Sequence, residues 1–387
     1  MFRAFLVLGL TSFGGPVAHL GYFREAFVVR RRWLSENAYA DLVALCQFLP
    51  GPASSQVGMA LGLRRAGPLG MLAAWTAFTL PSAVLLVAFA LGVGVAGVDP
   101  DAGWLRGLVA AAVAVVAHAV LGMARTLAPD RPRATIAVAA LAVAVLVPTA
   151  LGQVTAIVVG ALAGLVWVRG VAGTTAAEDA VTPALRRRTG AVLLGLFALL
   201  LVLLPVLTAV TGSAAVGLVD SSYRAGSLVF GGGHVVLPLL EAETVHRGLV
   251  GRDDFLAGYG AAQAVPGPLF TFAAYLGAVR TAAPGGLAGA GLALVSIFAP
   301  SALLVAGGLP FWERLRSSPL ARRALAGTGA AVVGLLSAAL YDPVFTDGVT
   351  STGTLVVAVA SFVALTVWRA PAWAVVLGAS CAGLVLL

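Results

Sequence analysis

The chain alternates between long apolar runs and short polar segments. Apolar runs with almost no charged residues lie at 68–98, 107–124, 134–168, 189–219, 281–309, 324–341 and 353–387. A helix needs about 20 apolar residues to cross the hydrocarbon core of a bilayer. The pattern therefore predicts an all-α, polytopic membrane protein.

Two of these runs are long enough for a pair of membrane spans each. Run 134–168 is interrupted at Pro148, and run 353–387 is interrupted at Trp368–Pro371, where a tight turn fits. With the shorter segments added, we expect about 10–13 membrane segments in the chain. We expect the amino terminus inside the cell and the carboxy terminus outside.

An internal repeat is the most informative feature of the sequence. Gln47-Phe48-Leu49-Pro50-Gly51-Pro52 recurs, 216 residues later, as Gln263-Ala264-Val265-Pro266-Gly267-Pro268. At the same offset Arg64 corresponds to Arg280. Two further motifs recur in the same order with small insertions: Phe13-Gly14-Gly15 as Phe230-Gly231-Gly232, and Pro81-Ser82-Ala83 as Pro300-Ser301-Ala302. The order of these matches indicates a duplicated unit.

The repeat and the polar segments together predict the domain organisation. The longest polar stretch, 169–189, is expected to be a linker on the cytoplasmic side. We expect a first transmembrane repeat at 1–168, a connecting transmembrane segment at 190–219 and a second transmembrane repeat at 220–387.

The charges that follow equivalent segments have opposite signs in the two halves. The first Gly-Gly segment is followed by a basic stretch, and the second by an acidic one: Arg24, Arg30, Arg31 and Arg32, against Glu241, Glu243, Asp253 and Asp254. Short cytoplasmic loops carry an excess of Lys and Arg. We therefore expect the two repeats to be inverted in the membrane, with the run at 189–219 supplying the change of orientation.

Composition excludes several classes of protein. Apolar residues make up 60% of the chain and charged residues only 10%, whereas soluble proteins carry about 25% charged residues. A soluble enzyme, a nucleic-acid binder and a disordered chain are therefore excluded, and the net charge of +8 is explained by loop arginines. Cys46 and Cys381 both lie in apolar runs, and the four histidines are scattered. We expect no disulfide, metal site or cofactor.

The two Pro-Gly-Pro motifs predict interrupted helices. Pro50 and Pro52 lack the N–H groups that a continuous helix requires, as do Pro266 and Pro268. Inverted repeats with interrupted helices are typical of secondary transporters, which bind their substrates at the interruptions. A helix that restarts at Ala53 directs unpaired N–H groups toward the break and favours an anion there. Ser54, Ser55 and Gln56 add side-chain donors in the first half only, and an ordinary interfacial turn is the alternative.

The glycine clusters are a second set of candidates. Gly14 and Gly15, and equally Gly231, Gly232 and Gly233, lie inside apolar segments, where glycine permits either an unwound helix near an ion or close helix packing. His19 and His234 follow these clusters, and each is a candidate oxyanion donor or proton relay as well as a candidate structural histidine. Arg64 and Arg280 either attract an anion or mark helix ends.

These motifs resemble the chromate ion transporter family in its long, two-domain form. The resemblance rests on the segment Thr11–His19, the basic segment ending Arg32-Trp33-Leu34, the segment 230–238 and both Pro-Gly-Pro motifs, each preceded by Gln47 or Gln263. It implies an inner-membrane carrier that exports chromate, confers chromate resistance and is driven by the proton gradient. The chain departs from many members at Ser54-Ser55-Gln56, where an Asn is expected.

The predicted function is thus secondary active transport of an oxyanion, most simply chromate, by alternating access. The alternatives are a carrier or exchanger of sulfate or another oxyanion, and an anion channel. An enzyme is not expected, because no nucleophile and base lie in matching segments. An ATP-driven pump is disfavoured, because the sequence has no phosphate-binding glycine loop followed by a lysine. The sequence is compatible with proton coupling and with a homodimer, and it determines neither.

Overall fold

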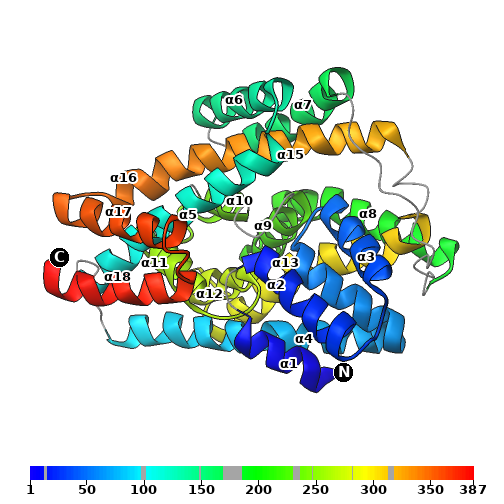
Figure 1. Cartoon of the computed structure of the whole chain (residues 1–387), viewed down its shortest axis with the longest axis horizontal. Helices are drawn as coiled ribbons and strands as arrows, with labels where there is room; N and C mark the ends of the chain where they lie inside the picture. The colour runs from blue at the N-terminus through cyan, green and yellow to red at the C-terminus, as the bar shows by residue number, and fades with distance from the viewer. Residues whose placement is uncertain are drawn as a thin grey trace.

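The computed structural model describes residues 1–12, 15–96, 102–147, 150–168, 185–229, 236–245, 247–280, 282–312 and 318–387. Every element in these ranges is a helix, as predicted (Figure 1). Residues 169–184 of the expected linker lie outside the described part of the chain, as do Gly14, the segment 230–235 with Gly231, Gly232, Gly233 and His234, and Glu313–Ser317.

The helices of the first half follow one another with short connections. They are α1 (Phe2–Thr11), α2 (Gly15–Phe23) with the π-helical turn η1 (Arg24–Arg30), α3 (Glu36–Phe48), α4 (Ala53–Ala96), α5 (Gly103–Leu127), α6 (Arg131–Leu146) and α7 (Ala150–Trp167). Helix α8 (Arg187–Thr211) follows and leads directly into α9.

The second half repeats the order of the first. Its elements are α9 (Ala214–Leu228), α10 (Val236–Thr244), α11 (Arg252–Ala264), η3 (Leu269–Thr271), α12 (Phe272–Val279), α13 (Gly286–Gly308), η4 (Leu309–Phe311), α15 (Pro319–Ala339), η5 (Leu340–Phe345), α16 (Thr346–Gly348), α17 (Thr352–Thr366) and α18 (Ala372–Leu386).

Polar residues at the segment boundaries define several helix starts. The side chains of Ser35, Asp130 and Ser318 accept hydrogen bonds from backbone N–H groups in the first turns of α3, α6 and α15, which is the usual way to satisfy these donors. Ser351 and Thr354 form a reciprocal capping box at the start of α17. The hydrogen bonds from Arg133 also hold the pKa of Asp130 below its ordinary value.

Five helical segments are long and apolar enough to cross a membrane. They are Ala53–Gly92, Gly103–Arg125, Arg187–Thr211, Gly286–Phe311 and Pro319–Gly348. Shorter apolar helices lie at Phe2–Thr11, Val154–Trp167, Leu269–Val279, Thr352–Thr366 and Ala372–Leu386. The expectation of an all-α polytopic membrane protein is confirmed.

Helix α4 consists of two arms that fold back on each other. The backbone leaves the helical region at Ala66 and Gly67, and a Cβ atom at Gly62 would lie 2.3 Å from the carbonyl oxygen of Gly70. In a straight helix residues 62 and 70 would be about 12 Å apart, so the chain reverses between them. The first arm, 53–65, is about 20 Å long and too short to cross a membrane.

The second half contains the same hairpin. Helices α12 and α13 pack together, and a Cβ atom at Gly277 would lie 2.3 Å from the carbonyl oxygen of Gly289. Each half therefore contains a short helix that starts after Pro-Gly-Pro and then turns back into a long membrane helix. We refer to 53–65 and 269–279 as the two half-helices.

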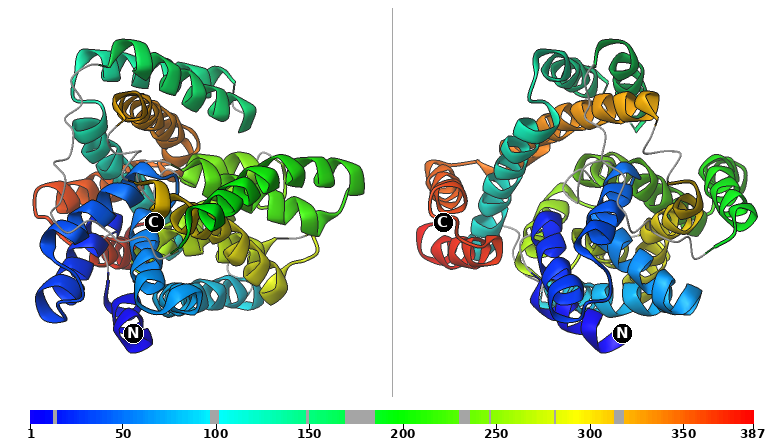
Figure 2. Two further views of the ribbon diagram at one scale, coloured as in Figure 1. Left: turned by 90° about the vertical axis from the view of Figure 1, so that its right-hand side faces the viewer. Right: turned by 45° about the vertical axis from the view of Figure 1, so that its right-hand side comes forward.

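The two halves exchange their last helices. Helices α6 and α7 of the first half pack on α15 of the second, while α17 and α18 of the second half pack on α5 of the first (Figures 1 and 2). The contacts are made backbone to backbone: a Cβ atom at Gly327 would lie 2.1 Å from the carbonyl oxygen of Gly160, and one at Gly107 would lie 2.2 Å from that of Ala379. Small residues permit such close helix packing in membranes.

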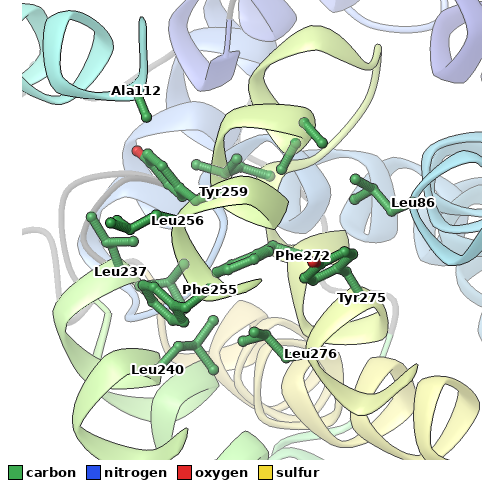
Figure 3. Packing of buried hydrophobic residues seen from close by; sticks show 14 of the residues in the cluster. Leu86, Ala112, Leu237, Leu240, Phe255, Leu256, Tyr259, Phe272, Tyr275 and Leu276 are labelled. Carbon is green, nitrogen blue, oxygen red and sulfur yellow. The ribbon is translucent and has the colours of Figure 1, made fainter. Parts of the chain in front are cut away.

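Aromatic packing fixes the position of the second half-helix. Phe255 and Tyr259 of α11 pack against Phe272 of α12, with ring centroids 5.1 and 5.9 Å apart, and Phe272 stacks on Tyr275 (Figure 3). These rings are fully buried and form part of the largest apolar cluster, which also includes Leu86 from the first half.

The close contact between α7 and α15 predicts that an added methyl group at Gly327 destabilises the fold. Gly327→Ala is expected to lower the free energy of unfolding by about 1–3 kcal/mol, because the added methyl group meets backbone that cannot move aside. Gly291→Ala in α13 is the control, since a Cβ atom there meets nothing within 4 Å and alanine is favoured over glycine in a helix. Thermal unfolding of the purified variants in detergent measures both effects. An equal response of the two variants would contradict the backbone contact.

Candidate functional site

Both predicted Pro-Gly-Pro interruptions are present. Helix α3 ends at Phe48 and α4 begins at Ala53; α11 ends at Ala264 and η3 begins at Leu269. The backbone angle φ is +124° at Gly51 and +104° at Gly267, a region that favours glycine. The glycine between the two prolines is therefore required by the shape of each turn.

Each turn is hydrogen-bonded to the opposite half of the protein. The N–H of Gly51 donates to the carbonyl of Val229 over 2.6 Å, and the N–H of Gly267 donates to the carbonyl of Ser12 over 2.9 Å. Val229 and Ser12 directly precede the two Phe-Gly-Gly segments. The two contacts are equivalent under the internal repeat, and they bring both pairs of repeated motifs together.

The third repeated motif also reaches the turns. A Cβ atom at Gly51 would lie 2.3 Å from Oγ of Ser301, and one at Gly267 would lie 2.8 Å from Oγ of Ser82. These serines are the central residues of the two Pro-Ser-Ala motifs in α13 and α4. From the sequence, this motif served only as a marker of the repeat. Its duplication was nevertheless a signal that could have predicted its position at the site.

His19 connects the first half-helix to the opposite turn. Its Nε2 atom lies 3.1 Å from the carbonyl oxygen of Ser12, and its Nδ1 atom lies 3.3 Å from Oγ of Ser54. A carbonyl only accepts hydrogen bonds, so Nε2 carries the hydrogen and, in a neutral ring, Nδ1 accepts one. The hydroxyl of Ser54 then donates to His19. The side chain is buried, and its ring lies edge-on to Phe78 at 5.4 Å.

Several buried side chains around the turns have no hydrogen-bond partner among the described residues. They are the hydroxyls of Ser12, Ser55, Thr79 and Ser301 and the Oε1 atom of Gln56, whose Nε2 donates to the carbonyl of Pro50 over 2.6 Å. Leaving a buried polar group unsatisfied costs about 1–3 kcal/mol. Unpartnered hydroxyls beside the two turns are chemically suited to a bound oxyanion or to ordered water.

The other predicted site residues lie in different surroundings. The side chain of Gln47 is exposed near the end of α3, whereas Gln263 is half-buried and hydrogen-bonded to Tyr259. Pro52, Pro266 and Pro268 are buried, and Pro50 is half-buried. Gly15 is the first residue of α2. A binding role for these residues stays a prediction.

A second polar cluster lies between α9 and α10. Of its residues, only Glu243 was named from the sequence. Glu243 of α10 lies 3.3 Å from Arg224 and 3.0 Å from Arg247, and Arg224 also pairs with Asp220 in α9. The acidic residues Asp220 and Glu243 are buried. Because the charges compensate one another, this cluster joins α9 to α10 as a neutral unit.

Known proteins similar to this chain are transporters. A family model described as "Chromate transporter" matches residues 1–165 and 216–384. The chain is 33% identical over 350 residues to a chromate transport protein of Pseudomonas aeruginosa, covering 88% of this chain and 80% of that protein. It is 28% identical over 344 residues to a probable chromate transport protein of Synechococcus elongatus, covering 87% and 82%. No solved structure matches the chain.

The geometry of the first turn predicts the effect of a single methyl group. Gly51→Ala is expected to lower both the unfolding temperature and transport, because the alanine meets the side chains of Ser301 and Gln56 and needs a backbone with positive φ that costs about 1–2 kcal/mol. Gly67→Ala is the matched control: Gly67 also has a positive φ, +65°, but a Cβ atom there meets nothing within 4 Å. Thermal unfolding in detergent compares the two. Equal losses would show that backbone strain alone, and not the contact with Ser301, makes glycine necessary.

Proposed function

Because the chain belongs to the chromate transporter family, we propose that it is a secondary active transporter that exports chromate across the inner (cytoplasmic) membrane and thereby confers chromate resistance. The observation that carries this proposal is the group of unpartnered hydroxyls where the two Pro-Gly-Pro turns meet the opposite repeat. Chromate is a tetrahedral dianion that resembles sulfate, and each of its oxygens accepts hydrogen bonds.

The first half-helix supplies the principal anion donors. The N–H groups of its first turn, 53–55, have no partner within the helix, and the helix dipole favours negative charge at this end. The hydroxyl of Ser55 is buried beside them without a partner. In the second half Leu269 and Phe270 stand at the corresponding start. The anion therefore binds mainly to the first half-helix, with Ser301 contributed by the second repeat.

His19 links anion binding to proton uptake. While His19 is neutral, the hydroxyl of Ser54 donates to it and is not available to the anion. A proton on Nδ1 makes His19 the donor, so that Ser54 can direct its O–H toward chromate. Among the described residues, His19 contacts Ser12, Ser54 and Phe78, none of them charged, so the added positive charge also attracts the dianion. Binding of either ligand then favours the other by the same factor.

The membrane potential supplies the driving force for export. A negative cell interior favours the exit of each negative charge by about 2.3 kcal/mol per 100 mV. Chromate accompanied by one proton still carries one net negative charge outward, so the voltage continues to favour export. In this scheme the voltage drives export and the inward proton gradient opposes it, in contrast to the coupling that the family resemblance implies.

The repeat supports alternating access as the mode of transport. The contacts Gly51–Val229 and Gly267–Ser12 are equivalent, so breaking one while keeping the other gives two related conformations. If the repeats are inverted, as their loop charges suggest, these conformations open to opposite sides of the membrane. The exchanged helices keep the halves joined while the turns separate.

Sulfate is the principal competing substrate, because it has the same shape and charge. Competition between labelled chromate and sulfate in inverted vesicles determines which anion is preferred. A channel, by contrast, would conduct without saturation.

Removal of the Ser55 hydroxyl tests the anion site directly. Ser55→Ala is expected to raise the KM for chromate uptake into inverted vesicles about 10- to 100-fold, which is the loss of one hydrogen bond to a charged group. Folding should not suffer, since this hydroxyl has no partner in the part of the chain that the structure describes. Ser337→Ala is the control, because its hydroxyl donates to the carbonyl of Val333 within α15. An unchanged KM in Ser55→Ala would remove Ser55 from the site.

Replacement of His19 tests the proton link. In the native protein, voltage-driven chromate uptake into inverted vesicles is expected to rise as the external medium is acidified, because protonated His19 releases Ser54. His19→Gln keeps a hydrogen-bonding side chain that does not titrate, and its uptake is expected to keep only the pH dependence that the titration of chromate itself causes. Ser54→Ala should flatten the profile as well, whereas His118→Gln, at an exposed position, should not change it. A native pH profile in His19→Gln would contradict the link.

A further inference from the structure

A buried arginine without a carboxylate partner ends the second half-helix. Arg280 follows α12 directly, and its side chain is only 7% exposed. Its Nη1 donates to the carbonyl of Ala214 over 3.1 Å, while its buried Nε has no partner. Within the described part of the chain no carboxylate lies within ion-pair distance of it. Burial without a compensating charge lowers the pKa of this guanidinium.

Other arginines of the same half are compensated. Arg224 and Arg247 pair with Asp220 and Glu243, and Arg252 pairs with Asp342 and Asp347 at 3.4 and 3.1 Å. An isolated buried charge costs several kcal/mol unless an opposite charge joins it. Arg280 therefore needs an anion that the described chain does not provide.

A small cavity lies beside this arginine. It is lined by Arg280, by Ser221 and Ser222 of α9, by Thr244 of α10 and by apolar side chains that include Leu240 and Leu276, both labelled in Figure 3. The cavity has a volume of about 10 Å³, close to the smallest space that holds one water molecule. A small oxyanion therefore enters only when the side chains that line the cavity move apart, and an organic ligand does not fit.

The donors that remain free in the cavity identify the charge of its ligand. Ser221 and Thr244 already donate to the carbonyls of Leu218 and Leu240 over 3.2 and 2.6 Å. Ser222 also lines the cavity and is buried as a residue. Arg280 and Ser222 thus offer a positive charge and one hydroxyl donor, a combination that selects an oxyanion over a cation.

The cavity is separate from the site at the turns. Arg280 stands at the end of the half-helix opposite to Gly267, and a helix of this length spans about 16 Å. Arg280 contacts Ala214, which lies at the start of α9, immediately after the end of α8. The cavity therefore lies toward the membrane face where α8 ends. Arg64, the equivalent residue of the first half, is only half-buried.

We propose that the cavity formed by Arg280 and Ser222 is a second binding site for a tetrahedral oxyanion of the chromate and sulfate class. It is a staging site at one membrane face, from which the anion moves to or from the turns. This inference rests on the proposed function, since it assigns the same class of ligand to a second place. The simpler role of Arg280 is to hold α9 through Ala214 and to neutralise the end of α12.

Equilibrium binding of radiolabelled sulfate and of radiolabelled chromate to the full-length protein in lipid nanodiscs tests the second site. The native chain is expected to bind two anions. Arg280→Gln and Ser222→Ala are each expected to weaken anion binding at the second site about 10- to 100-fold and to leave binding at the Ser55-dependent site intact. Arg280→Lys should restore part of the affinity of the second site. Ser55→Ala should weaken binding at the turns and leave the second site intact. Arg64→Gln is the matched control and should keep both sites.

The outcomes separate the two proposals. A native stoichiometry of one that only Ser55→Ala reduces would overturn the second site and leave the proposed function standing. Absence of any anion binding to the native chain would overturn both. If Arg280→Gln does not fold, Ser222→Ala still tests the second site, because Ser222 does not bind the carbonyl of Ala214.

Discussion

The structure depends on how a broken helix satisfies its backbone inside a membrane. A bilayer offers no water to unpaired N–H and C=O groups, so an interrupted helix is stable only where protein supplies the partners. At both Pro-Gly-Pro turns the partner comes from the other repeat: Gly51 donates to Val229, and Gly267 donates to Ser12. Neither half can complete its own turn. This mutual requirement holds the two repeats together at the place where we propose that the anion binds.

The exchange of the last helices reinforces the same dependence. Helices α6 and α7 pack on α15, and α17 and α18 pack on α5, through contacts so close that glycine is needed at positions such as Gly327. The halves are thus joined at their periphery as well as at the turns. The exchanged helices form a rigid periphery, whereas the turns at the centre are held by single hydrogen bonds. Because the central contacts are the weaker ones, this arrangement is suitable for rocking between two states.

The two halves share a fold but differ in polarity. The first half-helix begins with Ser54, Ser55 and Gln56, whereas the second begins with Leu269 and Phe270. His19 contacts Ser54 across a buried space, and the isolated buried arginine is Arg280 in the second half. Duplication supplied a symmetric frame, and the polar side chains made its two halves unequal. In the proposed mechanism this difference assigns the anion mainly to one half, while the electrochemical gradients set the direction of net transport.

The sequence by itself determined the membrane helices, the two interruptions and the duplication, because apolar length and the missing N–H of proline act locally. It predicted the restart of a helix at Ala53, which the structure confirms. Only the tertiary structure decided that His19 meets Ser54, that Ser82 and Ser301 approach the opposite turns and that Arg280 has no carboxylate beside it among the described residues. These facts depend on how segments distant in the sequence pack together. Residues such as Gly51 and Ser301, which are 250 positions apart, carry no local signal of their contact.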